Sequence, residues 1–231
     1  MREIVFDTET TGLNPAGGER MVEIGCIEIY NRVETGRHFH AYFNPEREMP
    51  VEAEAVHGLT TIFLSDKPRF TERVDELLEF IADSPLVAHN ASFDFGFLNF
   101  ELEQCGRSGV CLSRMVDTLT LARSKHPGAK HSLDALCMRF GIDRSQRIKH
   151  GALLDAQLLA QVYVELTGGR QIGLGLVADT SVAVAQSSRP VTLREYRPAR
   201  PHVAALEELE RHRAFIAKLV NPLWARFAGV G

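Results

Sequence analysis

The amino-acid sequence predicts an α/β domain in which helices cover a mixed β-sheet. Two observations lead to this expectation. Residues 1–43 contain segments in which apolar and polar side chains alternate, as they do in half-buried strands. From about residue 70 onward, segments with helical periodicity are interrupted by a short apolar strand. Strands that precede alternating helices and strands favour a sheet with both antiparallel and parallel neighbours.

The N-terminal strands would form a β-meander. Its first loop is the segment 14–18, which is rich in turn-forming residues, and Asn44-Pro45 ends the third strand. A later apolar run has the composition of a short buried strand. The expected strands are residues 3–6, 21–30, 38–43 and 86–89.

Helical periodicity is clearest in residues 70–81, whose apolar side chains fall on one stripe. Ser132 is a suitable N-cap for a later helix, and Gly141 is a suitable terminator of the same helix. A Gly-Gly pair at 168–169 would end the last helix of the body. The expected helices of the body are residues 70–81, 93–103, 133–140 and 152–166.

The pattern weakens after Gly169. Residues 177–190 are small and polar, which is typical of a flexible linker, and residues 203–220 have loose helical periodicity. Acidic residues outnumber basic ones in residues 1–176, whereas basic residues are in excess beyond them. The body therefore lacks the overall basic footprint of a general nucleic-acid binder, although a local basic patch can still serve one site.

Composition places the chain among globular proteins with a packed core. Hydrophobic residues make up 45% and charged residues 24% of the 231 residues, which excludes a fully disordered chain. No apolar run approaches the ~20 residues of a membrane span, and the N-terminus lacks the apolar core of a secretory signal. The four cysteines lack the spacing of a metal site or a disulfide framework, which indicates reduced thiols in a cytoplasmic protein.

Two carboxylates lie at the end of the first predicted strand. Because strand side chains alternate, Asp7 and Glu9 project to the same face, roughly 6–7 Å apart along the strand. Two acids so placed repel each other unless a cation lies between them, and oxygen ligands suit Mg²⁺ or Mn²⁺ better than Zn²⁺. Taken alone, the pair is also compatible with a polar strand end followed by a turn.

Two later segments carry further candidates. Asp94 falls in the first turn of a predicted helix, where an acid gains about 0.3–1 kcal/mol from the helix dipole without any catalytic role. His150 and Asp155 are about 140° apart on a helix, so they face one site only if His150 lies in the preceding loop. Asp117 follows strand-like residues and precedes a helix, so we interpret it as a helix cap rather than a further metal ligand.

Three motifs together are more specific than any one of them. The chain carries DTETTG at residues 7–12, NASFD at residues 90–94 and HGALLD at residues 150–155. In this order and spacing they resemble the motifs of the DEDDh family of 3′→5′ exonucleases, and the likeness covers about residues 1–170. The resemblance implies a ribonuclease-H-like fold. Further matching stretches are VHG at 56–58, SLDALC at 132–137 and LDAQ at 154–157.

The resemblance also implies the roles of these side chains. Four carboxylates would hold two divalent metal ions, Mg²⁺ or Mn²⁺, and His150 would act as the general base toward an attacking water. The products would be nucleoside 5′-monophosphates. The metal-binding and catalytic acids would be Asp7, Glu9, Asp94 and Asp155.

The same resemblance indicates where the terminal nucleotide would lie. Unpairing a terminal base costs least when the base is mismatched, so a site that accepts a frayed single-stranded end is selective without reading the base. Basic residues between Arg123 and Lys149 would hold upstream phosphates, or would simply form a solvated face. The two histidines in the set below could each instead be a hydrogen-bonded structural residue with no contact to the substrate. The expected substrate-binding residues are Thr10, Gly12, Leu13, His57, Phe93 and His89.

The C-terminal segments suggest partners. QIGLGL at residues 171–176 resembles a sliding-clamp-binding peptide, in which Gln171, Leu174 and Leu176 would be the anchors. Trp224, next to an arginine in the basic tail, has the character of an interface anchor for a polymerase subunit, although the tail can instead pack on the body. The expected organisation is an exonuclease domain at 1–169, a linker with the clamp-binding-like peptide at 170–190, and a polymerase-binding tail at 191–231.

We therefore expect a 3′→5′ exodeoxyribonuclease that removes mismatched 3′-terminal nucleotides as the proofreading component of a bacterial replicase. The linker, the clamp-like peptide and the long tail favour this hypothesis, since a free-standing trimming enzyme needs none of them. One alternative is a related exoribonuclease that trims RNA 3′ ends. The other is a non-catalytic polymerase adaptor, which the presence of every expected catalytic side chain disfavours.

Overall fold

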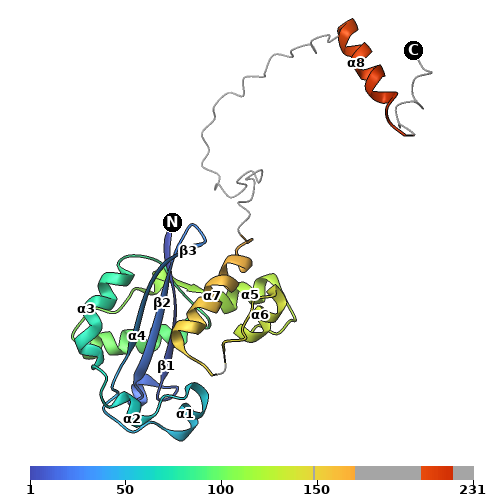
Figure 1. The fold of residues 1–231 in the computed structure, drawn as a ribbon. Helices are drawn as coiled ribbons and strands as arrows, with labels where there is room; N and C mark the ends of the chain where they lie inside the picture. Colours follow the sequence, from blue (N-terminus) through green and yellow to red (C-terminus); the bar gives the residue numbers. More distant parts are fainter. Residues whose placement is uncertain (148, 170–203, 221–231) are drawn as a thin grey trace, which may run out of the picture. The chain divides into compact units, whose positions relative to one another are not determined.

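The computed structural model describes residues 1–147, 149–169 and 204–220 of the chain (Figure 1). It divides into two units, Met1–Leu176 and Val177–Gly231, which are described separately. The first unit is built on a five-stranded sheet in the order β3-β2-β1-β4-β5. β1 pairs antiparallel with β2 and parallel with β4, so the sheet is mixed, as predicted. The strands are β1 (Arg2–Thr10), β2 (Met21–Tyr30), β3 (Val33–Tyr42), β4 (Leu86–Ala88) and β5 (Met115–Asp117).

Seven α-helices are described in this unit, and three of them have the predicted bounds. These three are α3 (Phe70–Ile81), α6 (Leu133–Phe140) and α7 (Ala152–Leu166). The other helices are α1 (Val51–His57), α2 (Thr61–Leu64), α4 (Ala91–Gln104) and α5 (Thr118–Lys125), with short 3₁₀ turns η1 (Pro15–Gly17) and η2 (Leu112–Arg114).

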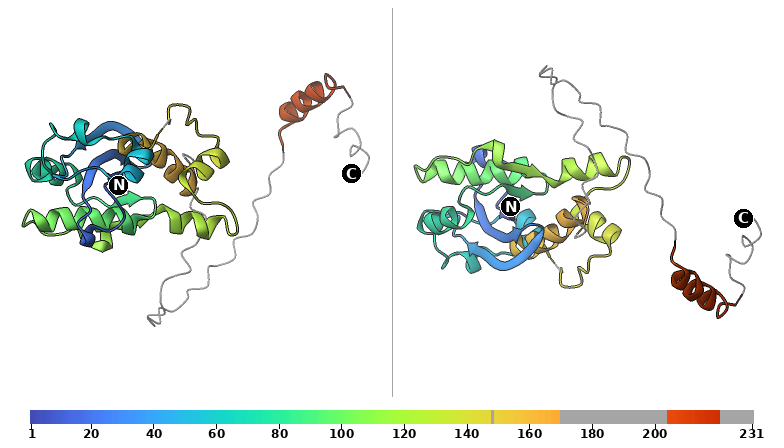
Figure 2. Two further views of the ribbon diagram at one scale, coloured as in Figure 1. Left: turned by 90° about the horizontal axis from the view of Figure 1, so that it is seen from below. Right: turned by 90° about the horizontal axis from the view of Figure 1, so that it is seen from above.

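Helices cover both faces of the sheet, and Figure 1 shows α3 and α7 on opposite sides of it. Alternation along β1 explains the two layers: Ile4 and Phe6 pack in one cluster with side chains of α3 and α4. Val5 faces the other way and packs with side chains of α7. Both views of Figure 2 show α4 and α5 in one row along the same side of the body. The core is thus divided by the sheet.

Local sequence signals fix several element ends. Asn31 and Arg32 join β2 to β3 with φ values of 50° and 67°, the left-handed pair that a tight hairpin turn requires. The Ser132 hydroxyl accepts a hydrogen bond from the Ala135 amide (3.3 Å), and Gly141 ends α6 in the left-handed region, as predicted. The four cysteines are free, also as predicted.

The sequence did not predict α1 and α2. They are only 7 and 4 residues long, too short for helical periodicity to be read. Val51 and Val56 in α1 are exposed, so α1 also lacks a clear apolar stripe. The third strand begins earlier than expected, at Val33, because the hairpin turn brings it straight back along β2.

The second unit contributes one described helix, α8 (Leu206–Ile216), in place of the expected residues 203–220. It buries none of its side chains. The predicted linker, the clamp-binding-like residues Gln171, Leu174 and Leu176, and Trp224 lie outside the described residues. Among the described helices, none combines the length and apolar character that crossing a membrane requires.

Candidate active site

The end of β1 carries two acids on one face of the sheet and contacts a third acid, from α4, on the other face. Asp7 and Glu9 share the face covered by α7, as predicted from strand alternation. Thr8 points to the other face, where its hydroxyl donates a hydrogen bond to Asp94 Oδ1 (2.7 Å) in the first turn of α4. Asp94 therefore approaches the strand end from the opposite layer, with Thr8 fixing its carboxylate.

A glycine allows α7 to reach the sheet. Gly25 on β2 is paired with Asp7 on β1, and a Cβ built on Gly25 would lie 2.4 Å from the backbone of Leu153. The first turn of α7 therefore packs directly on β2, and this close approach places Asp155 beside Asp7. Sequence reasoning missed Gly25, although a glycine inside a strand pattern is a known sign of close backbone approach.

The four acids lie close to one another in a largely buried site. Glu9, Asp94 and Asp155 are at most 8% exposed. Burial, reinforced by the charges of Asp94, Glu9 and Asp155, raises the pKa of Asp7 well above its ordinary value. Burial and neighbouring carboxylates raise the pKa of Glu9 to about 8, and burial raises the pKa of Asp94 to about 7. Such a cluster is destabilised at neutral pH unless a cation compensates its charge.

The donor set fits a divalent cation. One ligand atom each from Glu9, His150 and Asp155 lie within 4.8 Å of one another. Carboxylate oxygens are the ligands that Mg²⁺ and Mn²⁺ prefer, and Glu9 and Asp155 each offer such oxygens here. The structure thus brings together Asp7, Glu9, Asp155 and His150, with Asp94 adjoining through Thr8.

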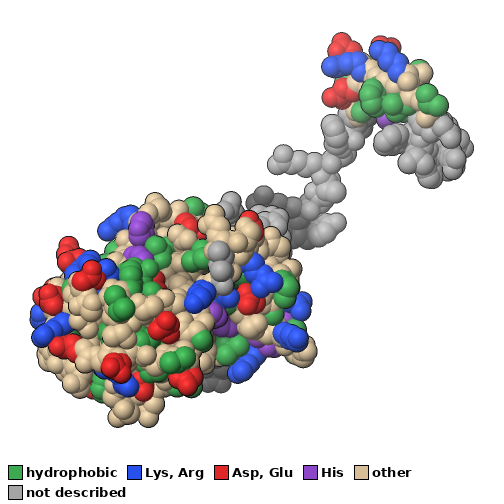
Figure 3. Space-filling model, turned by 60° about the horizontal axis from the view of Figure 1, so that its bottom comes forward, with side chains coloured by type: hydrophobic (Ala, Val, Ile, Leu, Met, Phe, Trp, Pro, Cys, Tyr) green, Lys and Arg blue, Asp and Glu red, His purple; other side chains and the backbone are tan. Residues whose placement is uncertain are grey.

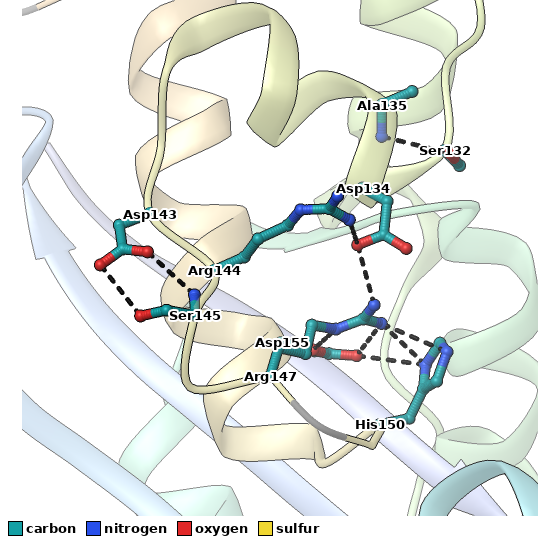
Figure 4. Close-up of polar contacts among 9 residues, drawn as sticks. All are labelled: Ser132, Asp134, Ala135, Asp143, Arg144, Ser145, Arg147, His150 and Asp155. Atoms are coloured by element: carbon teal, nitrogen blue, oxygen red, sulfur yellow. Dashed lines mark hydrogen bonds and ion pairs between the residues drawn. The ribbon is translucent and has the colours of Figure 1, made fainter.

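The loop between α6 and α7 carries His150, as predicted (Figure 4). The His150 side chain is half exposed, and its Nδ1 lies 3.3 Å from Asp155 Oδ2. Arg147 enters the same site: its Nε and Nη2 donate to the two oxygens of Asp155 (2.5 and 2.7 Å), and its Nη1 donates to Asp134 (3.0 Å). Arg147 Nη2 also lies 2.9 Å from His150 Nδ1. Sequence reasoning had placed Arg147 only in a basic run that faces DNA or solvent.

A pocket of about 500 Å³ adjoins the acids. Of its lining residues, Leu13 is 85% exposed, whereas His57 is buried. His57 Nδ1 accepts a hydrogen bond from the Leu59 amide (3.0 Å), its Nε2 makes no direct hydrogen bond within the normal distance limit to any described residue, and burial lowers its pKa. Every expected substrate residue except His89 lines this pocket: Thr10, Gly12, Leu13, His57 and Phe93.

His89 does not line this pocket. Its Nδ1 is hydrogen bonded to the Thr118 hydroxyl (2.9 Å) at the start of α5, which matches the structural alternative for this residue. Asp117 caps α5 by accepting from the Leu119 amide (3.0 Å), which confirms its interpretation as a cap. It also accepts from the amide of Asn90 (3.1 Å) at the start of α4. The start of α4 is therefore capped by an aspartate from β5, because the side chain of Asn90 makes no capping hydrogen bond.

Basic side chains gather on one side of the body. Figure 3 shows Lys, Arg and His side chains over the side that carries α5 and α6. Within the basic run, Arg144 and Arg147 both pair with Asp134 (2.8 and 3.0 Å). The exposed members of the run are Arg123, Lys125, Lys130, Arg139, Arg144 and Lys149.

Comparison with known proteins places this site in a family. The model of the exonuclease family RNase_T matches residues 4–163. The chain belongs to this exonuclease family. The predicted resemblance is thereby confirmed, and the presence of the exonuclease domain makes the chain a nuclease rather than a non-catalytic adaptor.

Similar exonucleases span nearly the whole chain. The DNA polymerase III subunit epsilon of Rickettsia conorii is 48% identical over 224 residues, covering 96% of this chain and 97% of that protein. The DNA polymerase III subunit epsilon of Escherichia coli K12 is 41% identical over 221 residues, covering 92% of this chain and 91% of that protein. The epsilon-type likeness therefore extends well beyond the family match at residues 4–163.

Solved exonuclease structures share the fold. Exonuclease X in complex with 5′ overhanging duplex DNA is 25% identical, with a TM-score of 0.56, and the match covers 71% of this chain and 90% of that one. The nuclease domain of 3′hExo, a DEDDh family member bound to rAMP, is 16% identical with a TM-score of 0.62, covering 72% and 91%. The predicted ribonuclease-H-like architecture is thus confirmed.

Proposed function

We propose that this exonuclease is the 3′→5′ proofreading subunit of a bacterial replicative DNA polymerase and acts in the cytoplasm. The observation that supports this best is the convergence of four carboxylates and His150 at the end of β1, beside a pocket that opens toward solvent. The epsilon-type relatives support DNA rather than RNA as the substrate, because they match the chain from the body into the tail.

Four acids would hold two divalent ions, Mg²⁺ or Mn²⁺. When bound, the ions supply an activated water and charge stabilisation at the scissile phosphate. Asp7 is the acid whose pKa the charges of the other three raise, and it would hold the ions together with them. Glu9 and Asp155 would complete one ion site, and Asp94, fixed by Thr8, would serve the other.

His150 would take the proton of the attacking water at a ring nitrogen. Its position in a loop and its half-exposed side chain allow it to pass that proton to solvent. The new bond forms between the water oxygen and phosphorus, the bond from phosphorus to the upstream 3′ oxygen breaks, and that oxygen leaves with a proton. The product is a nucleoside 5′-monophosphate, and the DNA is one nucleotide shorter.

The pocket would hold the terminal nucleotide. Leu13, Val56 and Phe93 offer apolar surface to a base or a sugar, and buried His57 offers a ring nitrogen in the pocket wall. These apolar surfaces accept any of the four bases. Selectivity for a mismatch would come from fraying, because a mismatched end costs less to unpair.

The function is tested by nucleotide release from a primer. Wild-type protein with Mg²⁺ should release 5′-mononucleotides from a 3′-mismatched DNA primer faster than from a matched one, and Asp7→Ala should abolish release. EDTA should stop the reaction and excess Mg²⁺ should restore it. Faster trimming of a matching RNA strand would favour the exoribonuclease alternative, and equal rates on matched and mismatched ends would contradict proofreading.

The polymerase (alpha) subunit of DNA polymerase III is the proposed partner of residues 191–231, and a sliding clamp is the proposed partner of residues 171–176. The sequence of the tail and the names of the epsilon-type relatives support the first of these. In full-length protein, Trp224→Ala should weaken co-purification with the alpha subunit while leaving exonuclease activity intact. Gln171→Ala should weaken only clamp binding. A Trp224→Ala protein that binds the alpha subunit normally would contradict the first assignment.

A further inference from the structure

Arg147 lies inside the acidic site although it belongs to a basic, largely exposed run. Its side chain is 10% exposed. The guanidinium is bound to both oxygens of Asp155, at 2.5 and 2.7 Å, which is the paired geometry in which arginine binds a carboxylate most strongly. Asp155 is 2% exposed, so this ion pair is shielded from water.

The same guanidinium also contacts the proposed base. Arg147 Nη2 lies 2.9 Å from Nδ1 and 3.3 Å from Nε2 of His150 (Figure 4). A guanidinium only donates hydrogen bonds, so this contact engages the lone pair with which His150 would accept a proton. Arg147 thus holds a metal-ligand candidate and the proposed base at the same time.

A divalent ion and Arg147 need the same carboxylate. Both oxygens of Asp155 point to the guanidinium, and Asp155 also belongs to the group Glu9, His150 and Asp155 that can hold a cation. A second positive charge brought to Asp155 would also repel the guanidinium. Arg147 therefore occupies the place of a cation on Asp155.

Asp134 offers Arg147 a second partner. Its Oδ1 accepts from Arg147 Nη1 (3.0 Å) and, at 2.8 Å, pairs with Arg144. Asp134 is about half exposed and lies in the first turn of α6. An arginine that leaves Asp155 can keep this contact.

We propose that Arg147 is a positioning residue that competes with a divalent cation for Asp155, so that cation binding leaves Arg147 paired with Asp134 alone and frees His150. The inference rests on the proposed metal-dependent function. Occupation of the metal site is thereby coupled to release of His150. As long as the ions are absent, His150 stays hydrogen bonded to Arg147.

Mn²⁺ binding to the full-length protein, without DNA, tests the competition. Free Mn²⁺ is measured by electron paramagnetic resonance at pH 8 for wild type, Arg147→Gln, Arg147→Lys and Arg144→Gln. Arg147→Gln should bind Mn²⁺ with about tenfold lower Kd, because the competing charge is gone, whereas Arg147→Lys should stay close to wild type. Arg144→Gln is the matched control, since Arg144 pairs with Asp134 but is not among the described hydrogen-bond or ion-pair partners of Asp155 and His150, and its Kd should equal that of wild type.

The outcomes separate the inference from the proposed function. If neither wild type nor Arg147→Gln binds Mn²⁺, the metal-dependent function itself fails. If wild type binds Mn²⁺ and Arg147→Gln binds it equally or more weakly while retaining native circular dichroism, the competition is refuted and the proposed function stands.

Nuclear magnetic resonance of the His150 ring nitrogens tests whether Mg²⁺ releases this side chain from Arg147. Mg²⁺ should shift the ring nitrogen resonances of His150 in wild type, assigned by their loss in His150→Ala. In Arg147→Gln these resonances should already lie near the shifted position before Mg²⁺ is added. Equal Mg²⁺-induced shifts in both proteins would overturn the coupling.

Discussion

Gly25 on β2 lies opposite Asp7 on β1, and the space where a side chain of Gly25 would stand is filled by the backbone of Leu153 in α7. This relationship sets how closely Asp155 approaches Asp7. A carboxylate held by the first turn of α7 moves with that turn, so the depth of helix packing determines the geometry of the acid cluster.

Gly25→Ala should therefore damage both folding and catalysis. Its new methyl group must push α7 outward, which we expect to cost about 1–3 kcal/mol of unfolding free energy and to lower kcat by about 10²-fold through misplacement of Asp155. Urea denaturation and primer degradation measure the two effects. Gly96→Ala is the control: Gly96 is exposed in α4 with open space around it, so this variant should gain up to about 1 kcal/mol and keep full activity. Unchanged activity in Gly25→Ala would mean that α7 can shift without consequence for the site.

His150→Ala distinguishes a base from a ligand. If His150 is the general base, the variant should bind Mn²⁺ like wild type while kcat falls by about 10²–10⁴-fold. Its proximity to Glu9 and Asp155 is also compatible with ligation, which would appear as a loss of Mn²⁺ affinity. Equilibrium Mn²⁺ binding and single-turnover rates on the same protein preparation decide between the two roles.

The stability of the metal-free protein should fall as pH rises. The folded-state pKa of Glu9 is about 8 and that of Asp94 about 7, both above the unfolded values, so the folded protein binds more protons and is favoured at low pH. This contribution is fully present below about pH 4 and is lost as pH rises through 7 and 8. Thermal melts in EDTA should show it, and the gain in Tm on adding Mg²⁺ should be larger at pH 8.5 than at pH 6. A Glu9→Gln protein should lose part of this dependence, and an equal Mg²⁺ effect at both pH values would contradict the expectation.

Leu13→Ala should weaken binding of the DNA end without weakening the fold. The Leu13 side chain is 85% exposed, so its removal should change the unfolding free energy by less than about 0.5 kcal/mol. Loss of its contact with the terminal nucleotide should raise KM by about fivefold, since stacking and apolar contacts to one base contribute about 1–3 kcal/mol. Ile62→Ala is the control, because Ile62 is equally exposed and does not line the pocket. The same KM for both variants would place the DNA end elsewhere.

Strong local patterns predicted much of the fold. The apolar stripe of α3 and the Ser132 cap of α6 each depend on residues close in sequence, and both helices have the predicted bounds. Asp7 and Glu9 were predicted to share a face for the same reason. The short helix α1 gave no such signal, since too few of its side chains are buried to produce a pattern.

Pairings across long stretches of chain were beyond sequence reasoning. The hydrogen bond from Thr8 to Asp94 depends on how α4 packs on the sheet. The close approach of Leu153 to Gly25 depends in the same way on how α7 packs on it. Arg147 was interpreted as part of a basic surface because charge alone does not show which way a side chain turns. Its inward pairing with Asp155 follows only from the position of the loop before α7.

The acids come from three layers, β1, α4 and α7, and α7 is the last of these along the chain. During synthesis, a nascent chain of fewer than 155 residues lacks Asp155 and so has only three of the four carboxylates, even if its strands have already formed. The proposed metal site would therefore be complete only once α7, the last of these three elements to be synthesised, packs against Gly25.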